Sequence, residues 1–375
     1  EIAQCLVGSE MCIRDREITL YKAAATIESV VKQYGYSTEE IIKLEGNENR
    51  MGCSPKVAEA VAKEAQSFSF YPDLNVTQLR KKLADRLKIA GDNLIFGNGS
   101  FELLSIIGDS YIEEGEEAII PVPSFNWYTN VTLINGGKPV YVNVEEDFTI
   151  HPDKILNAIT ERTKVIFLCN PNNPTGLLMK KEHLERLIRE IPERILFVID
   201  EAYLDFAEGD YPDTAALATQ KENLILLRTF SKSYGLAGLR IGYGIATPAV
   251  IDTLSKVRIP LNVSSVAQAA AVAAVEDDTY LNQVLENNRR SMELYYETFR
   301  ELGFDYLESS TNFVFVHTGI DAAWLQQEFL KHAIMIRSGL DYGYREWIRI
   351  SMGTYEENQK VVQVMKEIVK KAKEK

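Results

Sequence analysis

The chain is poor in the residues that build metal sites and disulfide frameworks. Its 375 residues include four cysteines and four histidines, and the cysteines are too few and too unevenly spaced for a disulfide framework or a zinc site. The histidines lie far apart, so no two of them have the spacing of metal ligands on one helix. These absences predict a protein without a metal centre and without structural disulfides.

Long apolar runs and an excess of basic residues are also missing. No window approaches the roughly 18 consecutive apolar residues that a membrane helix requires. The formal net charge is -13 at pH 7, whereas nucleic-acid binding requires a basic face. We therefore expect a cytoplasmic protein with neither a membrane nor a nucleic-acid partner. Any anionic ligand must then be held by a local group of arginines.

The first sixteen residues, EIAQCLVGSEMCIRDR, differ from the rest of the chain. They have neither the apolar core of a secretory signal nor a helical or strand period. They resemble the translated read-through of a sequencing adaptor. We therefore expect residues 1–16 to be a non-native leader that takes no part in the fold.

Short apolar runs alternate with amphipathic segments over most of the chain. Between two of these runs Leu184, Leu187, Ile188 and Ile191 follow the helical spacing i, i+3, i+4, i+7. The runs occupy residues 94–96, 118–121, 139–144, 164–169, 195–199, 223–228 and 241–246. Strands that alternate with helices predict an α/β fold, in which a mostly parallel sheet of roughly seven strands is sandwiched by helices.

The pattern changes after about Ser265. Long helical stretches at 267–275 and 281–302 are followed by short strand-like runs at 312–316, 334–336 and 347–350, and a last amphipathic helix closes the chain. We predict a large ligand-binding domain over residues 46–265 and a smaller α+β domain over 266–375. Residues 17–45 are expected to join the small domain and to border the substrate entrance.

One lysine has an unusual position. Lys232 lies between two serines just after the apolar run 223–228, and Arg240 follows eight positions later. In open α/β sheets ligands bind at the carboxyl ends of the strands, where Lys232 is expected. A lysine that forms a Schiff base needs a fixed position and a nearby site for an anionic cofactor. Most lysines are simply solvated, so the neighbouring motifs decide between the two interpretations.

Four further motifs are expected at ends of the predicted strands. Gly97–Leu104 reads GNGSFELL, a glycine-rich turn that enters a helix and could bind phosphate. Phe125, in PSF, could stack on a flat ring, and the loop NPNNPTG at 170–176 could orient an amide. Asp200, in DEAY, ends a strand, where a buried carboxylate needs a partner. Each motif alone also fits an ordinary turn or core residue.

Taken together and in this order, the motifs resemble the fold-type-I pyridoxal-phosphate aminotransferases of class I and II. The histidinol-phosphate aminotransferase group is the most similar, because YKAAATIESVVKQYG, IIKLEGNEN, SFSFYPD, IMIRSG and WIRISMGT fall where that group has its counterparts. The resemblance extends from Glu17 to nearly the end of the chain. It implies a cofactor, pyridoxal 5′-phosphate, and a homodimer.

The resemblance also implies roles for individual residues. Lys232 would form the Schiff base with the cofactor and move the substrate's proton, Asp200 would pair with the ring nitrogen, and Phe125 would stack on the ring. Tyr203 and Asn173 would bind the ring's phenolic oxygen. The implied phosphate contacts are Gly99, Ser100, Phe101, Thr229, Ser231 and Arg240, with Tyr71 entering from the second subunit.

The implied substrate site is built around arginine. Arg349 matches the residue that binds the substrate's carboxylate or phosphate, which the planar guanidinium engages bidentately. Asn173 contacts the substrate as well, while Arg337 and Tyr21 fall where the histidinol-phosphate group has further anion contacts. An arginine near a strand end can equally be a solvated or ion-paired side chain. The implied reaction transfers an amino group between histidinol phosphate and 2-oxoglutarate.

The chain departs from the group's pattern near the substrate pocket. It has Leu20 before Tyr21 and Ala24-Ala25 where the group usually has prolines and a glycine, Arg50 in place of a proline, and Phe101 in place of an aspartate. These departures leave three alternatives open: an aromatic amino-acid aminotransferase, a phosphothreonine decarboxylase of cobamide synthesis, and a catalytically silent pyridoxal-phosphate-binding protein.

Overall fold

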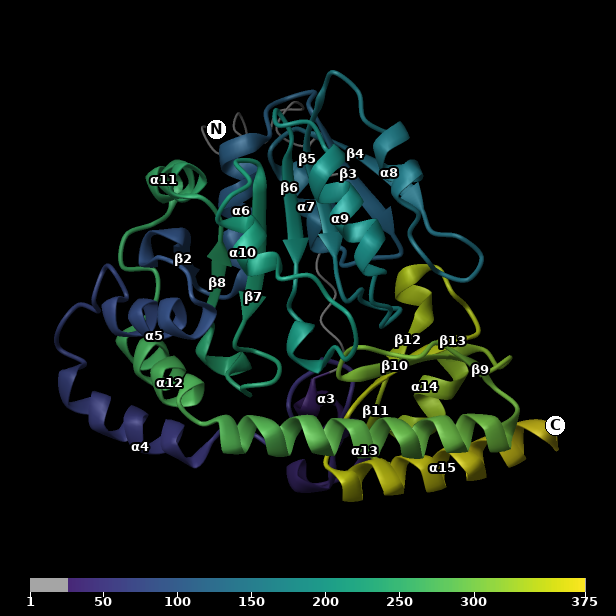
Figure 1. Ribbon diagram of the computed structural model, residues 1–375. Coiled ribbons are helices and arrows are strands. Elements are labelled where there is room, and N and C mark those ends of the chain that lie inside the picture. The colour runs from purple at the N-terminus through teal and green to yellow at the C-terminus, as the bar shows by residue number, and fades with distance from the viewer. Residues whose placement is uncertain (1–25, 375) are drawn as a thin grey trace, which may run out of the picture.

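The computed structural model describes residues 26–374 and contains two bodies, each built on its own sheet (Figure 1). The larger sheet has helices on both faces, and the smaller sheet lies beside the long helices near the C-terminus. This arrangement confirms the predicted fold class, an α/β body with a smaller α+β body. The leader 1–16 and Tyr21 lie outside the described residues.

The larger sheet has seven strands in the order β2-β8-β7-β6-β5-β3-β4. The strands β4, β3, β5, β6 and β7 run parallel to one another, whereas β8 runs antiparallel to its two neighbours, β7 and β2. The strands are β2 (Leu94–Gly97), β3 (Glu117–Val122), β4 (Lys138–Asn143), β5 (Thr163–Cys169), β6 (Leu196–Asp200), β7 (Leu224–Thr229) and β8 (Gly242–Ile245). The seven predicted strand positions are therefore confirmed.

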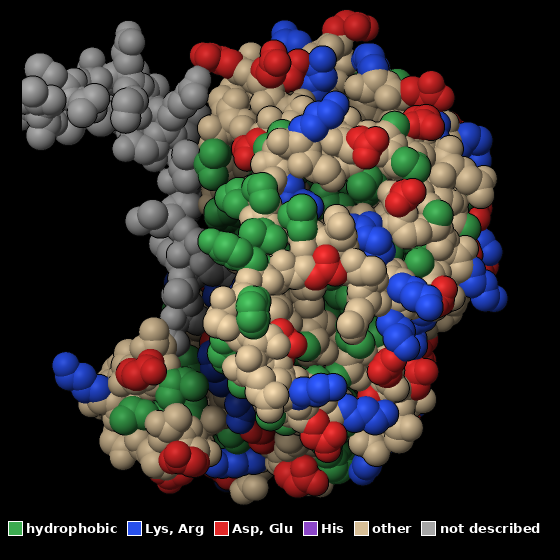
Figure 2. Space-filling view, turned by 90° about the vertical axis from the view of Figure 1, so that its left-hand side faces the viewer, with side chains coloured by type: hydrophobic (Ala, Val, Ile, Leu, Met, Phe, Trp, Pro, Cys, Tyr) green, Lys and Arg blue, Asp and Glu red, His purple; other side chains and the backbone are tan. Residues whose placement is uncertain are grey.

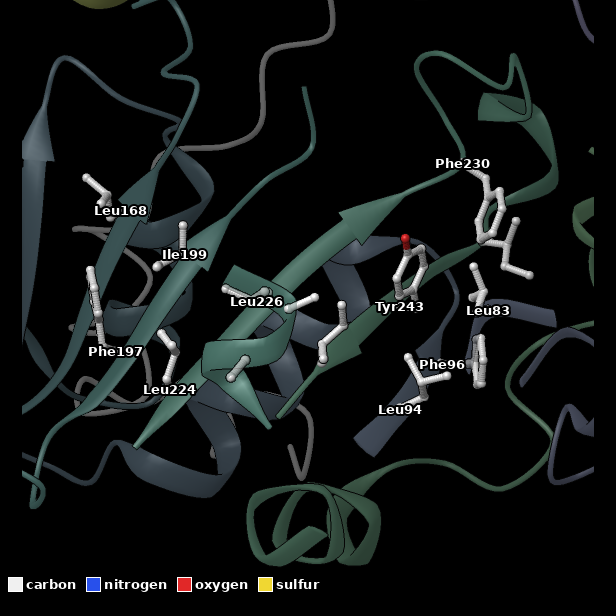
Figure 3. Close-up of a cluster of buried hydrophobic side chains, with 14 of the residues drawn as sticks. Leu83, Leu94, Phe96, Leu168, Phe197, Ile199, Leu224, Leu226, Phe230 and Tyr243 are labelled. Carbon is white, nitrogen blue, oxygen red and sulfur yellow. The ribbon is translucent and has the colours of Figure 1, made fainter. Parts of the chain in front are cut away.

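The central strands are continuous apolar runs because both faces of the sheet are covered. On one face Leu168, Ile199 and Leu226 pack together, and Phe230 and Tyr243 extend this cluster (Figure 3). The residues next to these along the strands point to the opposite face, where Phe167, Val198 and Leu227 are buried in a second cluster. Close packing on both sides fixes the register of β5, β6 and β7.

Nine helices of the described chain surround this sheet. The predicted helix is present as α9, with Leu184, Leu187 and Ile188 buried. The helices are α4 (Pro55–Glu64), α5 (Thr77–Leu87), α6 (Ser100–Tyr111), α7 (Trp127–Ile134), α8 (Pro152–Asn157), α9 (Lys181–Glu190), α10 (Thr214–Ala218), α11 (Pro248–Val257) and α12 (Ser265–Val275).

The smaller body contains an antiparallel sheet in the order β12-β13-β10-β9, and a two-stranded parallel sheet of β1 and β11. The strands are β1 (Ile42–Lys43), β9 (Asp305–Tyr306), β10 (Phe313–His317), β11 (Ile334–Met335), β12 (Arg337–Ser338) and β13 (Trp347–Ser351). The helices are α3 (Ile27–Tyr34), α13 (Asp278–Leu302), α14 (Ala322–Leu330) and α15 (Tyr355–Lys373).

The packing bears on where the two bodies divide. Ile42 and Leu44 pack in the core of the smaller body. The buried alanines of α12, including Ala267 and Ala271, belong to the core of the larger body. We therefore propose a division between α12 and α13, slightly after the predicted boundary at residue 265.

No helix within residues 26–374 is long and apolar enough to cross a membrane. The same stretch of chain holds no group of three or more His, Cys, Asp or Glu side chains arranged to bind a metal ion.

Candidate active site

A cavity of about 1100 Å³ opens where the carboxyl ends of β5, β6 and β7 meet the smaller body. The structure brings twelve of the predicted site residues into its wall. They are Ser100, Phe101, Phe125, Asn173, Asp200, Tyr203, Thr229, Ser231, Lys232, Arg240, Arg337 and Arg349.

Neighbouring strands place the central groups together. Asp200 is the last residue of β6 and lies beside Cys169 of β5 and Leu227 of β7 in the sheet register. Lys232 follows the end of β7 at Thr229, and Asn173 follows the end of β5. Because the carboxyl ends of parallel strands share one edge, residues far apart in sequence meet in one cavity.

Asp200 is a buried carboxylate with two hydrogen-bond donors. Its side chain accepts from the Tyr128 hydroxyl at 2.8 Å and from the backbone N–H of Ala202 at 3.1 Å, and only 4% of the residue is exposed. None of the described residues forms an ion pair with it. Burial raises the pKa of Asp200 to about 6, although the hydrogen bond from Tyr128 opposes this rise. The site therefore suits a cationic group of a ligand.

Lys232 projects into the cavity as a partly buried amine. Its Nζ donates to the carbonyl oxygen of Gly46 at 3.3 Å and lies 5.5 Å from the centre of the Tyr203 ring. Burial lowers the pKa of Lys232 to about 8, and the charges of Arg349 and Arg240 contribute to this shift. At pH 7 the Lys232 amine is then neutral in about a tenth of the molecules, a far larger fraction than for a solvated lysine. A neutral amine is the form that attacks a carbonyl carbon.

A hydrogen-bonded chain links Tyr203, Asn173 and Arg349. The amide of Asn173 donates to the Tyr203 hydroxyl at 3.4 Å, and Arg349 donates to the Asn173 carbonyl oxygen at 2.7 Å. Burial raises the pKa of Tyr203, so its hydroxyl stays protonated. Since the hydroxyl oxygen accepts from Asn173, its proton can be donated to a ligand oxygen.

A second group of residues forms a cradle for an anion. The hydroxyl of Thr229 donates to Ser231 Oγ at 3.0 Å, and Arg240 lies on the same cavity wall. Helix α6 begins at Ser100, so its amino-terminal amides and dipole favour an anion here. Gly99, with φ +79°, allows the close approach, because a Cβ at this position would collide with the guanidinium of Arg240. This cradle fits a phosphate group.

Two arginines form the opposite wall. Arg337 of β12 and Arg349 of β13 are paired directly across the antiparallel strands, so both side chains lie on one face. Arg337 forms an ion pair of 2.7 Å with Asp341. Arg349 is held by the Tyr342 hydroxyl at 2.7 Å, and its buried Nε has no hydrogen-bond partner among the described residues. Like charges that face each other favour binding of an anion.

Aromatic rings line the remaining side. Phe125 lies at the cavity, and Phe101 meets its ring edge to face at 5.2 Å between ring centres. Trp127 packs on Phe101 at 5.3 Å. Phe101, which stands where the family usually has an aspartate, therefore packs against Phe125, the residue expected to stack on a flat ligand.

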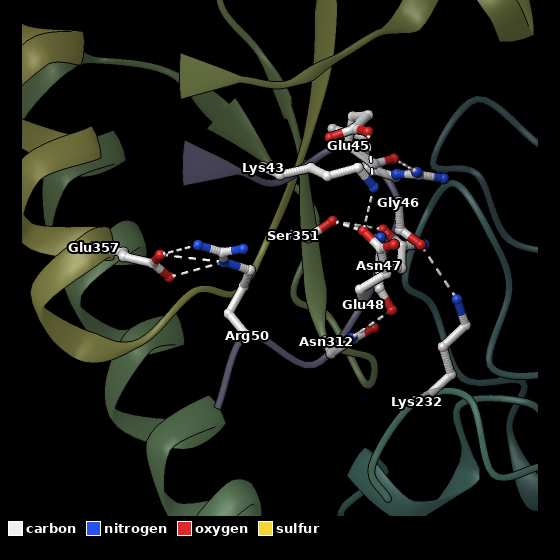
Figure 4. A network of polar contacts seen from close by, with 11 residues as sticks. Lys43, Glu45, Gly46, Asn47, Glu48, Arg50, Lys232, Asn312, Ser351 and Glu357 are labelled. Atoms are coloured by element: carbon white, nitrogen blue, oxygen red, sulfur yellow. Dashed lines mark hydrogen bonds and ion pairs between the residues drawn. The ribbon is translucent and has the colours of Figure 1, made fainter. Parts of the chain in front are cut away.

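The segment 45–49 contacts several of these groups and was not assigned a role from sequence (Figure 4). Arg349 donates to the carbonyl oxygen of Glu45 at 2.5 Å, and Lys232 contacts the next carbonyl, that of Gly46. The Asn47 amide donates to the Tyr203 hydroxyl at 3.0 Å. The signal was present in the motif IIKLEGNEN, whose asparagines and glycine are typical of an irregular polar loop.

Arg50 lies just beyond this segment and does not line the cavity. Its guanidinium forms a bidentate ion pair with Glu357 in the first turn of α15, with Nε 3.1 Å and Nη2 2.5 Å from Oε1 (Figure 4). The residue that replaces the family's proline thus attaches the segment to the smaller body.

One predicted residue lies away from the cavity of its own chain. Tyr71 follows α4 and is 87% exposed. Phe68, Phe70 and Leu74 near it are exposed as well. Figure 2 shows hydrophobic side chains gathered on the side of the molecule that carries α4, α5 and α11. The expected role of Tyr71 concerns a second subunit, so it stays a prediction.

Known proteins match both bodies of the chain. The family model for aminotransferase class I and II matches residues 39–365. The histidinol-phosphate aminotransferase of Geobacillus sp. (strain WCH70) is 38% identical over 356 residues, which cover 95% of this chain and 97% of that protein. The histidinol-phosphate aminotransferase of Caldicellulosiruptor saccharolyticus is 38% identical over 355 residues, which cover 94% and 98%.

A solved structure agrees with these matches. The crystal structure of histidinol-phosphate aminotransferase from Sinorhizobium meliloti, in complex with pyridoxal-5′-phosphate, superposes with a TM-score of 0.88 at 28% identity. The superposition covers 98% of this chain and 99% of that chain. Since the family match includes every strand that brings Asp200, Lys232 and Arg240 together, the chain belongs to the class I and II aminotransferases, and the resemblance seen in its motifs is confirmed.

Proposed function

We propose that the protein is a pyridoxal-phosphate-dependent transaminase that transfers the amino group of histidinol phosphate to 2-oxoglutarate. The observation that carries the proposal is the convergence of Asp200, Lys232 and Arg240 in one cavity, opposite the paired Arg337 and Arg349. The names of the relatives support histidinol phosphate as the substrate.

The residues present suit the cofactor. Asp200, buried without a cationic partner, would pair with the ring nitrogen, and Phe125 would cover the ring. The cradle of Ser231, Arg240 and the start of α6 would hold the phosphate, with Thr229 supporting Ser231. When bound, pyridoxal phosphate supplies an aldehyde carbon that joins to amines and a cationic ring that accepts the electrons released at the substrate's α-carbon.

Lys232 is proposed as the acid–base group of the reaction. Its neutral amine would anchor the cofactor and, once the substrate amine has taken its place, would remove the proton from the substrate's α-carbon. It would then deliver this proton to the C4′ carbon of the cofactor. The lowered pKa of about 8 suits a group that must take and release a proton near neutral pH. Tyr203 and Asn173 would hold the ring's phenolic oxygen.

The smaller body would select the substrate. The paired Arg337 and Arg349 suit the doubly charged phosphate of histidinol phosphate, and the same pair would bind the carboxylates of 2-oxoglutarate in the second half-reaction. Asn173 would orient Arg349, to which it is hydrogen-bonded.

We also propose a cytoplasmic location for the protein. The free thiols of Cys53 and Cys169 are in keeping with this location.

A substrate panel tests the proposed function. Purified protein with pyridoxal phosphate is incubated with histidinol phosphate, phenylalanine, tyrosine or phosphothreonine together with 2-oxoglutarate, and glutamate and carbon dioxide are measured. We expect the highest kcat/KM for glutamate formation with histidinol phosphate, and no turnover in K232A. Glutamate formed only from the aromatic amino acids, carbon dioxide released from phosphothreonine, or no turnover despite bound cofactor would each favour one of the alternatives.

The role of Arg337 is tested by its removal. In R337A the phosphate loses one of two facing cations, so we expect KM for histidinol phosphate to rise about tenfold or more. R345A is the matched control, because Arg345 is paired with Asp321 and its side chain is 78% exposed. An unchanged KM in R337A would contradict the assignment of Arg337 to the substrate phosphate.

We also propose a homodimer with shared active sites. The exposed side chains of Phe68, Phe70, Tyr71 and Leu74 form an apolar segment that a second copy would cover. Tyr71 does not line the cavity of its own chain, and we propose that in the dimer it reaches the cofactor phosphate of the partner.

A complementation experiment tests the sharing. Y71A and K232A are purified separately, unfolded together, refolded and assayed. A mixed dimer contains one site with both residues intact, so random pairing should restore about a quarter of the wild-type activity. Refolding each variant alone is the control. If Tyr71 acted within its own chain, no site would be intact and the mixture would stay inactive.

A further inference from the structure

A tyrosine of α7 that no sequence motif singled out holds the carboxylate at the centre of the site. Tyr128 is fully buried, and its hydroxyl donates to Asp200 Oδ2 at 2.8 Å. Burial holds the pKa of Tyr128 well above its usual value, so the hydroxyl remains a donor throughout the working pH range. The other carboxylate oxygen accepts from the backbone of Ala202. The two donors fix the orientation of the carboxylate.

The ring of Tyr128 is held as firmly as its hydroxyl. It stacks on Phe167 of β5, with ring centres 5.1 Å apart and planes inclined by 5°. It also meets the ring of Phe125 edge to face, with the centres 5.5 Å apart. One side chain therefore touches both Asp200, which is proposed to pair with the nitrogen of the cofactor ring, and Phe125, which is proposed to cover that ring.

Other charged or titratable groups surround Asp200. Cys169 lies beside it on β5, and Lys232 approaches from the connection after β7. Glu201 comes directly after the end of β6 and is paired with Arg228 at 2.8 Å. Among the described residues, Tyr128 is the one side chain that donates a hydrogen bond to the Asp200 carboxylate.

We propose that Tyr128 is a positioning residue. It orients Asp200 through its hydroxyl and Phe125 through its ring, so that both residues contact the cofactor ring. This inference rests on the proposed cofactor role of Asp200 and does not depend on the identity of the amino substrate. The Tyr128 hydroxyl stabilises the charged Asp200 carboxylate, which pairs with the nitrogen of the cofactor ring. The Tyr128 ring fixes the orientation of the Phe125 ring.

The test is the pH dependence of cofactor binding. The affinity of cofactor-free wild type and Y128F for pyridoxal phosphate is measured from pH 5 to 9 by the visible absorbance of the bound cofactor. Wild type should lose affinity below about pH 6, where Asp200 becomes protonated. Y128F should bind about tenfold or more weakly near neutral pH, since a hydrogen bond to a charge is lost. Its loss of affinity should begin at higher pH.

Two controls separate positioning from general loosening. Y211F removes a partly buried hydroxyl that donates to Glu201 at 2.9 Å, which is also a tyrosine–carboxylate bond and lies one residue from Asp200, and should match wild type. The second control is 1-deazapyridoxal phosphate, in which carbon replaces the ring nitrogen. With this probe wild type and Y128F should bind alike, because Asp200 has no cation to pair with.

The outcomes are distinct. If wild type does not bind pyridoxal phosphate, the cofactor assignment and this inference both fail. If wild type binds and Y128F has the same affinity and pH dependence, or if Y211F shifts equally, the positioning role of Tyr128 alone is wrong. Should Y128F not fold, F167L loosens the Tyr128 ring without removing its hydroxyl; it should move the pH dependence in the same direction, and an unchanged profile would overturn the proposal.

Discussion

The active site is organised around a negative charge buried at the carboxyl end of β6. Asp200 has two hydrogen-bond donors and no cationic partner among the described residues, and its pKa is raised to about 6. An isolated buried carboxylate costs several kcal/mol of stability, so such a group persists where a function requires it. Close packing of β5, β6 and β7 on both faces keeps it in place.

The positive charges that line the cavity come from both bodies. Arg240 comes from the larger body and Arg349 from the smaller one, and together with burial they lower the pKa of Lys232 to about 8. The same cations that suit an anionic cofactor and an anionic substrate therefore also prepare the lysine amine for chemistry near neutral pH. In the proposed reaction, binding and proton transfer would depend on one set of charges.

The segment 45–49 joins the two halves of this arrangement. Its backbone and side chains contact Arg349, Lys232 and Tyr203, which belong to different elements. Arg50 then attaches the segment to α15 through Glu357. A substrate bound at Arg349, as proposed, would thus contact a residue that is hydrogen-bonded to Asn173 of the larger body and to the segment 45–49.

Much of this organisation is predictable from the sequence. The buried strands are continuous apolar runs, and Lys232, Asp200 and Asn173 lie at or just after the ends of three of them, so their convergence at one edge of the sheet could be inferred. The contact of Tyr128 with Asp200 could not, because the two are 72 residues apart and a buried tyrosine resembles any core residue. The facing of Arg337 and Arg349 depends on strand register, and the pairing of Arg50 with Glu357 spans 307 residues.

The most direct test of the account is a crystal structure of the protein with pyridoxal phosphate bound. The account predicts that the ring nitrogen lies within hydrogen-bond distance of Asp200, the phosphate among Ser231, Arg240 and the start of α6, and Phe125 against the ring. A cofactor whose nitrogen points away from Asp200, or whose phosphate lies at Arg337 and Arg349 instead, would contradict the assignment of the buried carboxylate as the centre of the site.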